Sequence, residues 1–381
     1  MTTVFNRDWD TKTNRLFLGD ALGLADLINV MYPKLEELAL LQRSQFWVET
    51  EVSMEQDKKQ WPTLSKVHQD ITLLNLSWQT MTDSLISRAP EACIKPLVSR
   101  PELEGMLRQW AYFEDLHSRA YSNIIREMLP DPATFIDTVT KNEHAYARIA
   151  NSVEILDELH EVGQYFLAVR DNLGQNVYPD DEYDKVTIEC QEALAKTFYA
   201  VYGLEAMQFY ASFACTFALA EQDVLPGVAK NLQLIAKDEA IHTVMSSEIL
   251  KLMYEEFDPE VMARAKAAAP QLLRETLESE VEWAKFIFSE GRSIVGLNSE
   301  LLTDYLYYVG YRAFKAVGIE WPSDLPVITR HPIPWIENWL DTAAQQVAPQ
   351  EMQITNYRVG QLEGSTEESV DNFANEFGDM F

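Results

Sequence analysis

Two histidines in this sequence follow a glutamate by three residues, in the order Glu-x-x-His. The pairs are Glu114 with His117 and Glu239 with His242. Residues three positions apart on a helix share a face, so each pair can bind one metal ion. A single pair of this kind is weak evidence, because Asp157 and His160 show a similar spacing that we interpret as a surface feature. The two Glu-x-x-His pairs differ from it in their surroundings.

Both pairs lie in apolar segments, and an acidic residue precedes each pair at a similar distance. The segments are WAYFEDLHSRAY and LIAKDEAIH. Asp83 lies 31 residues before Glu114, and Glu205 lies 34 residues before Glu239. A helix, a short turn and an antiparallel return need about that length. This order of an acid and a Glu-x-x-His, repeated once, is typical of ferritin-like di-iron proteins, whose ligands project inward from four helices of a bundle.

The charges of such a site require cations. A buried carboxylate without a partner is costly, and four of them are tolerated only when positive charge neutralises them. Two divalent ions balance four carboxylates, and oxygen and imidazole donors without thiolates favour Fe or Mn over structural Zn. The alternative, ordinary buried ion pairs, has few basic residues in register, the nearest to the second pair being Lys237. The predicted ligands are Asp83, Glu114, His117, Glu205, Glu239 and His242.

A tyrosine and several apolar residues share the helical faces of these ligands. Tyr121 follows His117 by four residues. Phe209 and Phe213 follow Glu205 at the fourth and eighth positions, and Ile235 precedes Glu239 by four. Two interpretations stay open for Tyr121: a protected tyrosine that becomes oxidised, or a core phenol bonded to a ligand carboxylate.

The elements that must position these residues are long helices. Apolar residues recur at spacings of three and four from about residue 32, with a turn-rich break at 174–183. Helices are expected over about 184–221, 222–253, 259–290 and 298–317, and Asp131-Pro132 and Asp258-Pro259 are expected helix starts. No convincing run of alternating strands appears. We predict an all-α chain: an N-terminal extension at 1–30, a ferritin-like helical bundle at 31–345 and a flexible acidic C-terminal tail at 346–381.

Composition excludes several function classes. A formal net charge of -29 argues against nucleic acid as a partner, because phosphate contacts need clustered basic residues. The three cysteines are far apart and form no CxxC pair, which favours a reducing compartment. No leader-like N-terminus and no run of about 18 apolar residues appears, so no membrane association is expected. A cytoplasmic protein is predicted, in the host cytoplasm if a phage encodes it.

The last 31 residues, 351–381, are acidic, with Arg358 as their only basic residue and four apolar side chains near the end. Those side chains are Phe373, Phe377, Met380 and Phe381. Such a segment cannot bury enough surface to fold alone. It is either a frayed terminus or a docking peptide that orders on a partner.

Several segments, in order and spacing, resemble the small (β) subunit of class I ribonucleotide reductase, most strongly the subgroup of enterobacteria and their large phages. The site segments are TDSLISRAP, WAYFEDLHSRAYSNIIR, LEAMQFYASFACTFA and LIAKDEAIH, and others are SQFWVETEV and HPIPWIENWL. The resemblance covers most of the chain. It implies two iron ions, with manganese as the alternative, one held by Asp83, Glu114 and His117 and the other by Glu205, Glu239 and His242.

The resemblance also implies a radical function. Tyr121 would become a stable radical when the reduced diiron centre reacts with O2, inside a pocket lined by Phe209, Phe213 and Ile235. Trp47 and Asp238 match positions that link the site to the surface, with Asp238 bonded to His117. In the tail, Tyr357 and Glu351 match residues that pass the oxidation to the large (α) subunit, on which the last residues would dock. A homodimer is expected from the same resemblance.

Some positions depart from the enterobacterial pattern. Phe113 stands where a small serine is usual, and Val48 stands where arginine is usual. Ala120 and Ser122 flank Tyr121 where serine and threonine are usual. None of these changes removes a predicted ligand or the tyrosine, but Phe113 bears on oxygen access and metal preference.

Two other classes compete with this interpretation. An iron store of the ferritin type predicts a shorter chain and no partner tail. A di-iron oxygenase or desaturase also keeps Glu-x-x-His pairs but has no need of Tyr121 or of an acidic aromatic tail. The set of Trp47, Asp238 and Tyr357 favours radical chemistry.

Overall fold

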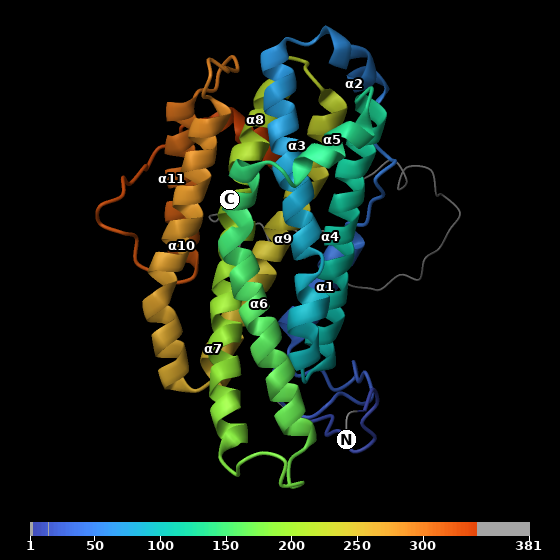
Figure 1. The fold of residues 1–381 in the computed structure, drawn as a ribbon, viewed down its shortest axis with the longest axis vertical. Coiled ribbons are helices and arrows are strands. Elements are labelled where there is room, and N and C mark those ends of the chain that lie inside the picture. Colours follow the sequence, from blue (N-terminus) through green and yellow to red (C-terminus); the bar gives the residue numbers. More distant parts are fainter. Residues whose placement is uncertain (1–2, 14, 341–381) are drawn as a thin grey trace.

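The computed structural model describes residues 3–13 and 15–340, and these form a bundle of long helices (Figure 1). The long helices are α3 (Lys66–Ile86), α4 (Pro101–Met128), α6 (Glu143–Asp171), α7 (Glu182–Gly203), α9 (Pro226–Glu256), α10 (Pro259–Ile287) and α11 (Ser299–Ala316). The shorter ones are α1 (Pro33–Ser44), α2 (Glu55–Gln60), α5 (Pro132–Val139), α8 (Tyr210–Ala220) and α12 (Glu337–Leu340). Within the described ranges there is no β-strand, only two isolated bridges. The predicted all-α class is confirmed.

Local sequence signals set many of the helix starts. Asp131 accepts from the Thr134 amide at the start of α5, and Asp258 accepts from the Glu260 amide at the start of α10. In both helices proline occupies the first turn, where a missing N–H costs nothing. The two helix starts predicted at Asp-Pro dipeptides are therefore confirmed.

The predicted helix over 184–221 is wrong in one respect, because it is interrupted. After Gly203 the chain makes one π-helical turn, η4 (Leu204–Gln208), and then continues as α8. A π-turn adds a residue to the helical repeat and is frequent at functional sites. The next helix begins at Pro226 rather than at 222, after Leu225 in the left-handed region at φ 52°.

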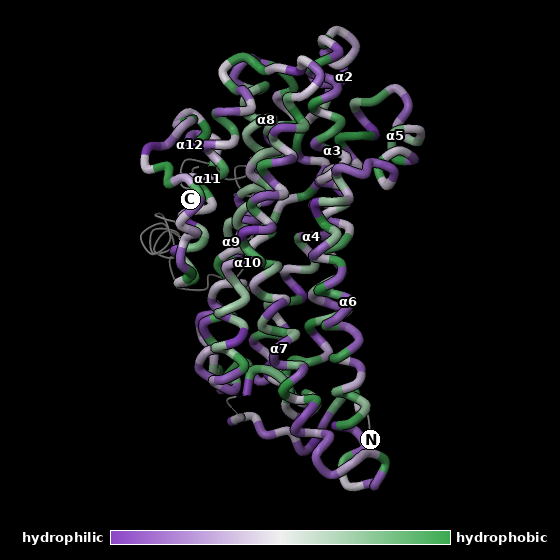
Figure 2. Tube along the Cα trace, turned by 60° about the vertical axis from the view of Figure 1, so that its left-hand side comes forward, coloured by the Kyte–Doolittle hydropathy of each residue, from purple (hydrophilic) through white to green (hydrophobic). Residues whose placement is uncertain are grey.

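The core lies between the long helices, and hydrophobic and hydrophilic residues alternate along them (Figure 2). Figure 1 shows α3, α4, α6, α7 and α9 running along the long axis, with α10 and α11 on one side. In the part of the chain that the structure describes, no helix has an apolar stretch long enough to cross a membrane. The three cysteines are free thiols.

The N-terminal extension, described for 3–13 and 15–30, is irregular and is held to the bundle by a buried arginine. Arg100 donates to the backbone oxygens of Thr11 and Thr13, at 2.9 Å each, and to that of Asn29. It also forms a two-bond ion pair with Glu102, and both side chains are fully buried. The predicted tail at 346–381, with Glu351 and Tyr357, lies outside the described residues.

Candidate metal centre

Four helical segments bring the six predicted ligands into one cluster. α3 contributes Asp83, α4 contributes Glu114 and His117, η4 contributes Glu205, and α9 contributes Glu239 and His242. The ligand atoms form two overlapping groups, and within each group they lie within 4.8 Å of one another. The groups are Asp83, Glu114, His117 and Glu239, and Glu114, Glu205, Glu239 and His242. Two ions fit this arrangement, one in each group.

Each of the two expected triads lies within one of these groups, and the groups overlap. Glu114 and Glu239 belong to both groups, so each can bridge two ions with its two carboxylate oxygens. Spacing along the sequence could not show this, because bridging depends on how α4 and α9 face each other. Asp157 and His160, the surface pair with similar spacing, are both exposed.

The cluster is buried, and many of its carboxylate oxygens have no hydrogen-bond donor. The six side chains are at most 2% exposed. Both oxygens of Asp83, both oxygens of Glu205 and one each of Glu114 and Glu239 have no hydrogen-bond partner. Among the described residues, the ion pairs that reach these carboxylates come from His117 and His242, not from lysine or arginine. Buried polar atoms normally have partners, so these atoms fit a site that binds cations.

Both imidazoles present Nδ1 to the carboxylates. His117 Nδ1 lies 3.2 Å from Glu239 Oε1, and His242 Nδ1 lies 2.8 Å from Glu114 Oε1. On the outer side, His117 Nε2 lies 3.1 Å from Asp238 Oδ2. An outer carboxylate that accepts a hydrogen bond from Nε2–H holds the proton on Nε2 and leaves the Nδ1 lone pair for a metal.

His242 has an outer partner as well, which the sequence did not reveal. Its Nε2 contacts the side-chain amide of Gln42 on α1, whose Oε1 has no other partner. With the amide turned, Gln42 Oε1 accepts the His242 Nε2–H, which keeps that proton on Nε2. Finding this contact requires knowing that α1 packs against α9.

The protonation of the metal-free cluster follows from burial and from the neighbouring charges. Burial, with repulsion from neighbouring carboxylates, raises the pKa of Asp83 and Glu205 well above the usual range. Burial acts the same way on Glu114 and Glu239, but the imidazoles outweigh it and lower the pKa of both.

The histidines show the opposite balance. Burial alone would lower their pKa, but the ionised glutamates raise it, to about 9 for His242 and well above the usual value for His117. The raised pKa values favour protons on Asp83, Glu205 and both imidazoles, and the lowered ones favour ionised Glu114 and Glu239. Two divalent ions would balance the charge of four carboxylates with two neutral imidazoles.

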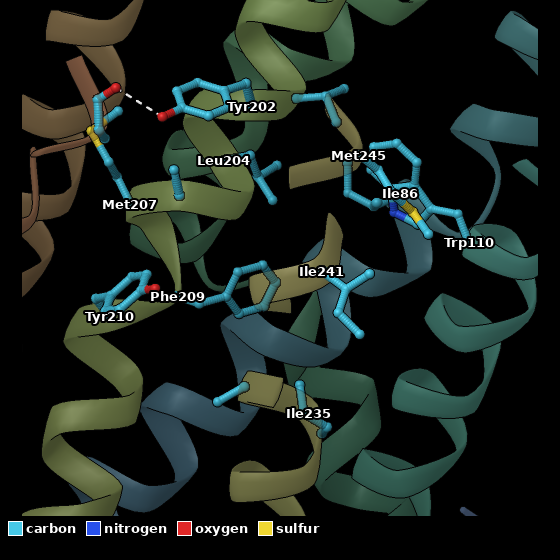
Figure 3. Packing of buried hydrophobic residues seen from close by; sticks show 14 of the residues in the cluster. Ile86, Trp110, Tyr202, Leu204, Met207, Phe209, Tyr210, Ile235, Ile241 and Met245 are labelled. Carbon is cyan, nitrogen blue, oxygen red and sulfur yellow. Dashed lines mark hydrogen bonds between the residues drawn. The ribbon is translucent and has the colours of Figure 1, made fainter. Parts of the chain in front are cut away.

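Tyr121 lies beside this cluster. Its side chain is fully buried, and its hydroxyl has no hydrogen-bond partner. Burial, with the charge of Asp83 as the next cause, raises the pKa of Tyr121 well above its usual value. Phe209, Phe213 and Ile235 are buried, and the two phenylalanine rings stack at 5.7 Å. Figure 3 shows Phe209 and Ile235 on one side of η4 and Tyr210 on the other.

A chain of contacts leads from the cluster to the buried indole of Trp47. Trp47 Nε1 donates to Asp238 Oδ2 at 2.8 Å, and that oxygen also contacts His117. The Trp47 and His117 rings are stacked, with centroids 6.2 Å apart. The expected bond between Asp238 and His117 is present.

Trp110 is a second residue that the sequence reasoning missed. Its Nε1 donates to Glu114 Oε1 at 2.9 Å, and its ring stacks on His242 at 5.2 Å. The signal was present in the sequence, because Trp110 precedes Glu114 by four residues on the same helical face.

Fold and site together define a class: a ferritin-like helical bundle with a buried carboxylate and histidine centre that can hold two metals. A family model described as "Ribonucleotide reductase, small chain" matches residues 25–322. The chain is 35% identical to "Ribonucleoside-diphosphate reductase 1 subunit beta" of Salmonella typhimurium over 98% of this chain and 99% of that protein. It is 30% identical to "Ribonucleoside-diphosphate reductase subunit beta" of Enterobacteria phage T4, over 97% and 98% of the two chains.

Among solved structures, "Ribonucleotide reductase R2 subunit from Clostridium botulinum" superimposes with a TM-score of 0.70 at 21% identity, covering 89% of this chain and 98% of that one. This likeness concerns the fold. The chain belongs to the ribonucleotide reductase small-chain family. It is the β subunit of an oxidoreductase that reduces ribonucleoside diphosphates and acts together with a large subunit.

Proposed function

We propose that this subunit generates and stores a radical on Tyr121, using two iron ions held by Asp83, Glu114, His117, Glu205, Glu239 and His242. The observation that carries the proposal is the place of Tyr121, a fully buried phenol beside the ligand carboxylate of Asp83. When bound and reduced, two irons supply electrons to O2 and the oxidising power that removes an electron from a nearby phenol.

The chain's own residues have three tasks in this proposal. The raised pKa of Tyr121 disfavours a phenolate, so the proton leaves with the electron, and Asp83 is the carboxylate with the largest electrostatic effect on that phenol. Phe209, Phe213 and Ile235 keep water and reductants away from the oxidised ring, which prolongs its life.

The third task is transfer. The chain His117, Asp238 and Trp47 offers a route along which the oxidation leaves the centre, and Tyr357 and Glu351 continue it to the large subunit. The acidic tail docks there, and the subunit works as a homodimer. The family relationship supports these steps, and the hydrogen bonds at Asp238 support the first of them.

Donor type alone leaves iron and manganese as alternatives, since both accept carboxylate and imidazole ligands. The fold also resembles a structure named "Streptococcus sanguinis dimanganese(II)-NrdF", at 18% identity and a TM-score of 0.61, which is a likeness of fold alone. We propose iron, with O2 as the oxidant.

The test is nucleotide reduction by the subunit mixed with its large subunit after loading with iron or manganese in air. Iron-loaded wild type should be active, and Tyr121→Phe should be inactive with its metal retained. Tyr210→Phe is the matched control, because Tyr210 is also buried beside the centre and turned away from Phe209 and Ile235 (Figure 3). Activity only after manganese loading would contradict the iron assignment, and an active Tyr121→Phe variant would contradict the radical.

A further inference from the structure

The π-helical turn η4 is the least regular element of the metal centre. It carries Glu205, which, like Asp83, has two carboxylate oxygens without a hydrogen-bond donor among the surrounding helices. The position of this carboxylate therefore depends on the backbone that bears it. An α-helix turns about 100° per residue. Relaxation of the extra residue of η4 into regular α-helix would rotate Glu205 relative to α8 by about that angle.

A buried arginine on α6 is hydrogen-bonded to the last residue of this turn. Arg148 Nη2 donates to the backbone oxygen of Gln208 at 2.7 Å. In return, Gln208 Nε2 donates to the backbone oxygen of Arg148 at 2.9 Å. The Arg148 side chain is 2% exposed. These reciprocal bonds join α6 to the last residue of η4.

Two residues of α10 also contact this segment and its arginine. Glu280 is fully buried, forms an ion pair with Arg148, and accepts from the Ala211 amide at 3.1 Å. Ser279 Oγ accepts from Gln208 Nε2 at 3.1 Å. At the other end of the turn, a Cβ on Gly203 would lie 3.0 Å from Leu273 Cδ2, so α10 packs closely along the whole segment.

Two indole rings hold the guanidinium in place. The Arg148 Cζ atom lies 3.6 Å from the ring centroid of Trp78 and 4.6 Å from that of Trp283. Such cation–π contacts strengthen when the charge is desolvated. Trp78 also packs edge-to-face on the Phe209 ring, with centroids 5.0 Å apart. The contacts of Arg148 therefore extend to Phe209, one of the residues proposed to surround Tyr121.

We propose that Arg148 and Glu280 are positioning residues that hold Leu204–Gln208 in its π-helical form and so place Glu205 for the second metal ion. This inference rests on the proposed dimetal function. Neither residue contacts the cluster, and both act through the backbone of η4 and α8. Residues that orient ligands from outside commonly change metal affinity 10–100-fold when replaced.

The test is anaerobic titration of the metal-free protein with Co²⁺, followed by calorimetry and by the visible Co²⁺ spectrum. Wild type should bind two ions. In Arg148→Met and Glu280→Gln the affinity of one site should fall about 10–100-fold, with an altered spectrum, while the site of Asp83 and His117 keeps its affinity. A single replacement leaves the other member of the ion pair as an unpaired buried charge, which can prevent folding. The double variant Arg148→Met with Glu280→Leu removes both charges and avoids this.

The matched control is the other buried ion pair, Arg100 with Glu102, which ties down the N-terminal extension instead of η4. Arg100→Met should lower the Tm and leave both Co²⁺ affinities unchanged. Two unchanged sites in Arg148→Met and in the double variant would overturn the inference alone. Failure of wild type to bind two ions would instead contradict the proposed function.

Discussion

Trp47 donates its indole N–H to Asp238 Oδ2, and this carboxylate oxygen is also the one that contacts His117 Nε2. A single atom therefore connects a metal-facing imidazole to an indole beyond the cluster. Asp238 is fully buried and its pKa is raised by burial, while its bonds to His117 and Trp47 oppose that effect. This shared acceptor makes the transfer route testable.

Replacing Trp47 should separate radical formation from radical transfer. In Trp47→Phe the ring volume is largely kept but the donor to Asp238 is lost, so we expect normal metal content, a Tyr121 radical and background nucleotide reduction. Trp61→Phe, another buried indole, serves as the control. Assays of radical yield and turnover on the same sample check this. Turnover at the wild-type rate would show that the route does not use Trp47.

Replacing Tyr357, at the other end of the proposed transfer route, should also separate radical formation from radical transfer. Tyr357→Phe should leave the metal content and the radical intact and abolish nucleotide reduction, because only transfer to the large subunit is blocked. The measurement is turnover by the mixed subunits, with the radical quantified beforehand. Full turnover would exclude this tyrosine from the route.

Glu239 should matter to both metal positions. It belongs to both ligand groups, so Glu239→Ala should weaken both sites and abolish the radical. Asp83→Ala should weaken chiefly the site that it shares with His117. Equilibrium dialysis against Mn²⁺ or Co²⁺ gives the stoichiometries. Unchanged metal content in Glu239→Ala would show that the ligand set is wrong.

Metal binding should release protons. The pKa values of Asp83, Glu205 and both imidazoles are raised in the metal-free cluster, and metal binding requires these four groups without their protons. Because these pKa values are raised, affinity should fall as pH falls, and deprotonation of His242 should contribute near its pKa of about 9.

Calorimetry in buffers of different ionisation enthalpy measures this release. Binding that releases no protons would contradict the raised pKa values of these four groups.

Helical spacing predicted much of the site. Glu114 with His117 and Glu239 with His242 required only the three-residue rule, and the intervening lengths identified Asp83 and Glu205. The π-turn at Leu204–Gln208 could not be predicted, because all five residues are buried and the segment has no exposed face whose periodicity would reveal a break.

Contacts between helices distant in the chain were also beyond the sequence. Gln42 reaches His242 across 200 residues, and Arg148 reaches Glu280 across 132. Phe113, one of the positions that depart from the enterobacterial pattern, is buried. Its ring packs edge-to-face on Tyr112, so Phe113 is part of the core packing near Glu114. The structure offers no account of its effect on oxygen access.

The central claim is that the oxidised residue is Tyr121. The most direct measurement is the EPR spectrum of iron-loaded, oxygen-exposed protein containing either ordinary or ring-deuterated tyrosine. A tyrosyl signal that narrows with deuteration and is absent from Tyr121→Phe, at equal iron content and with Tyr210→Phe unchanged, is the predicted result. A signal of normal intensity in Tyr121→Phe, or one insensitive to deuteration, would contradict the account.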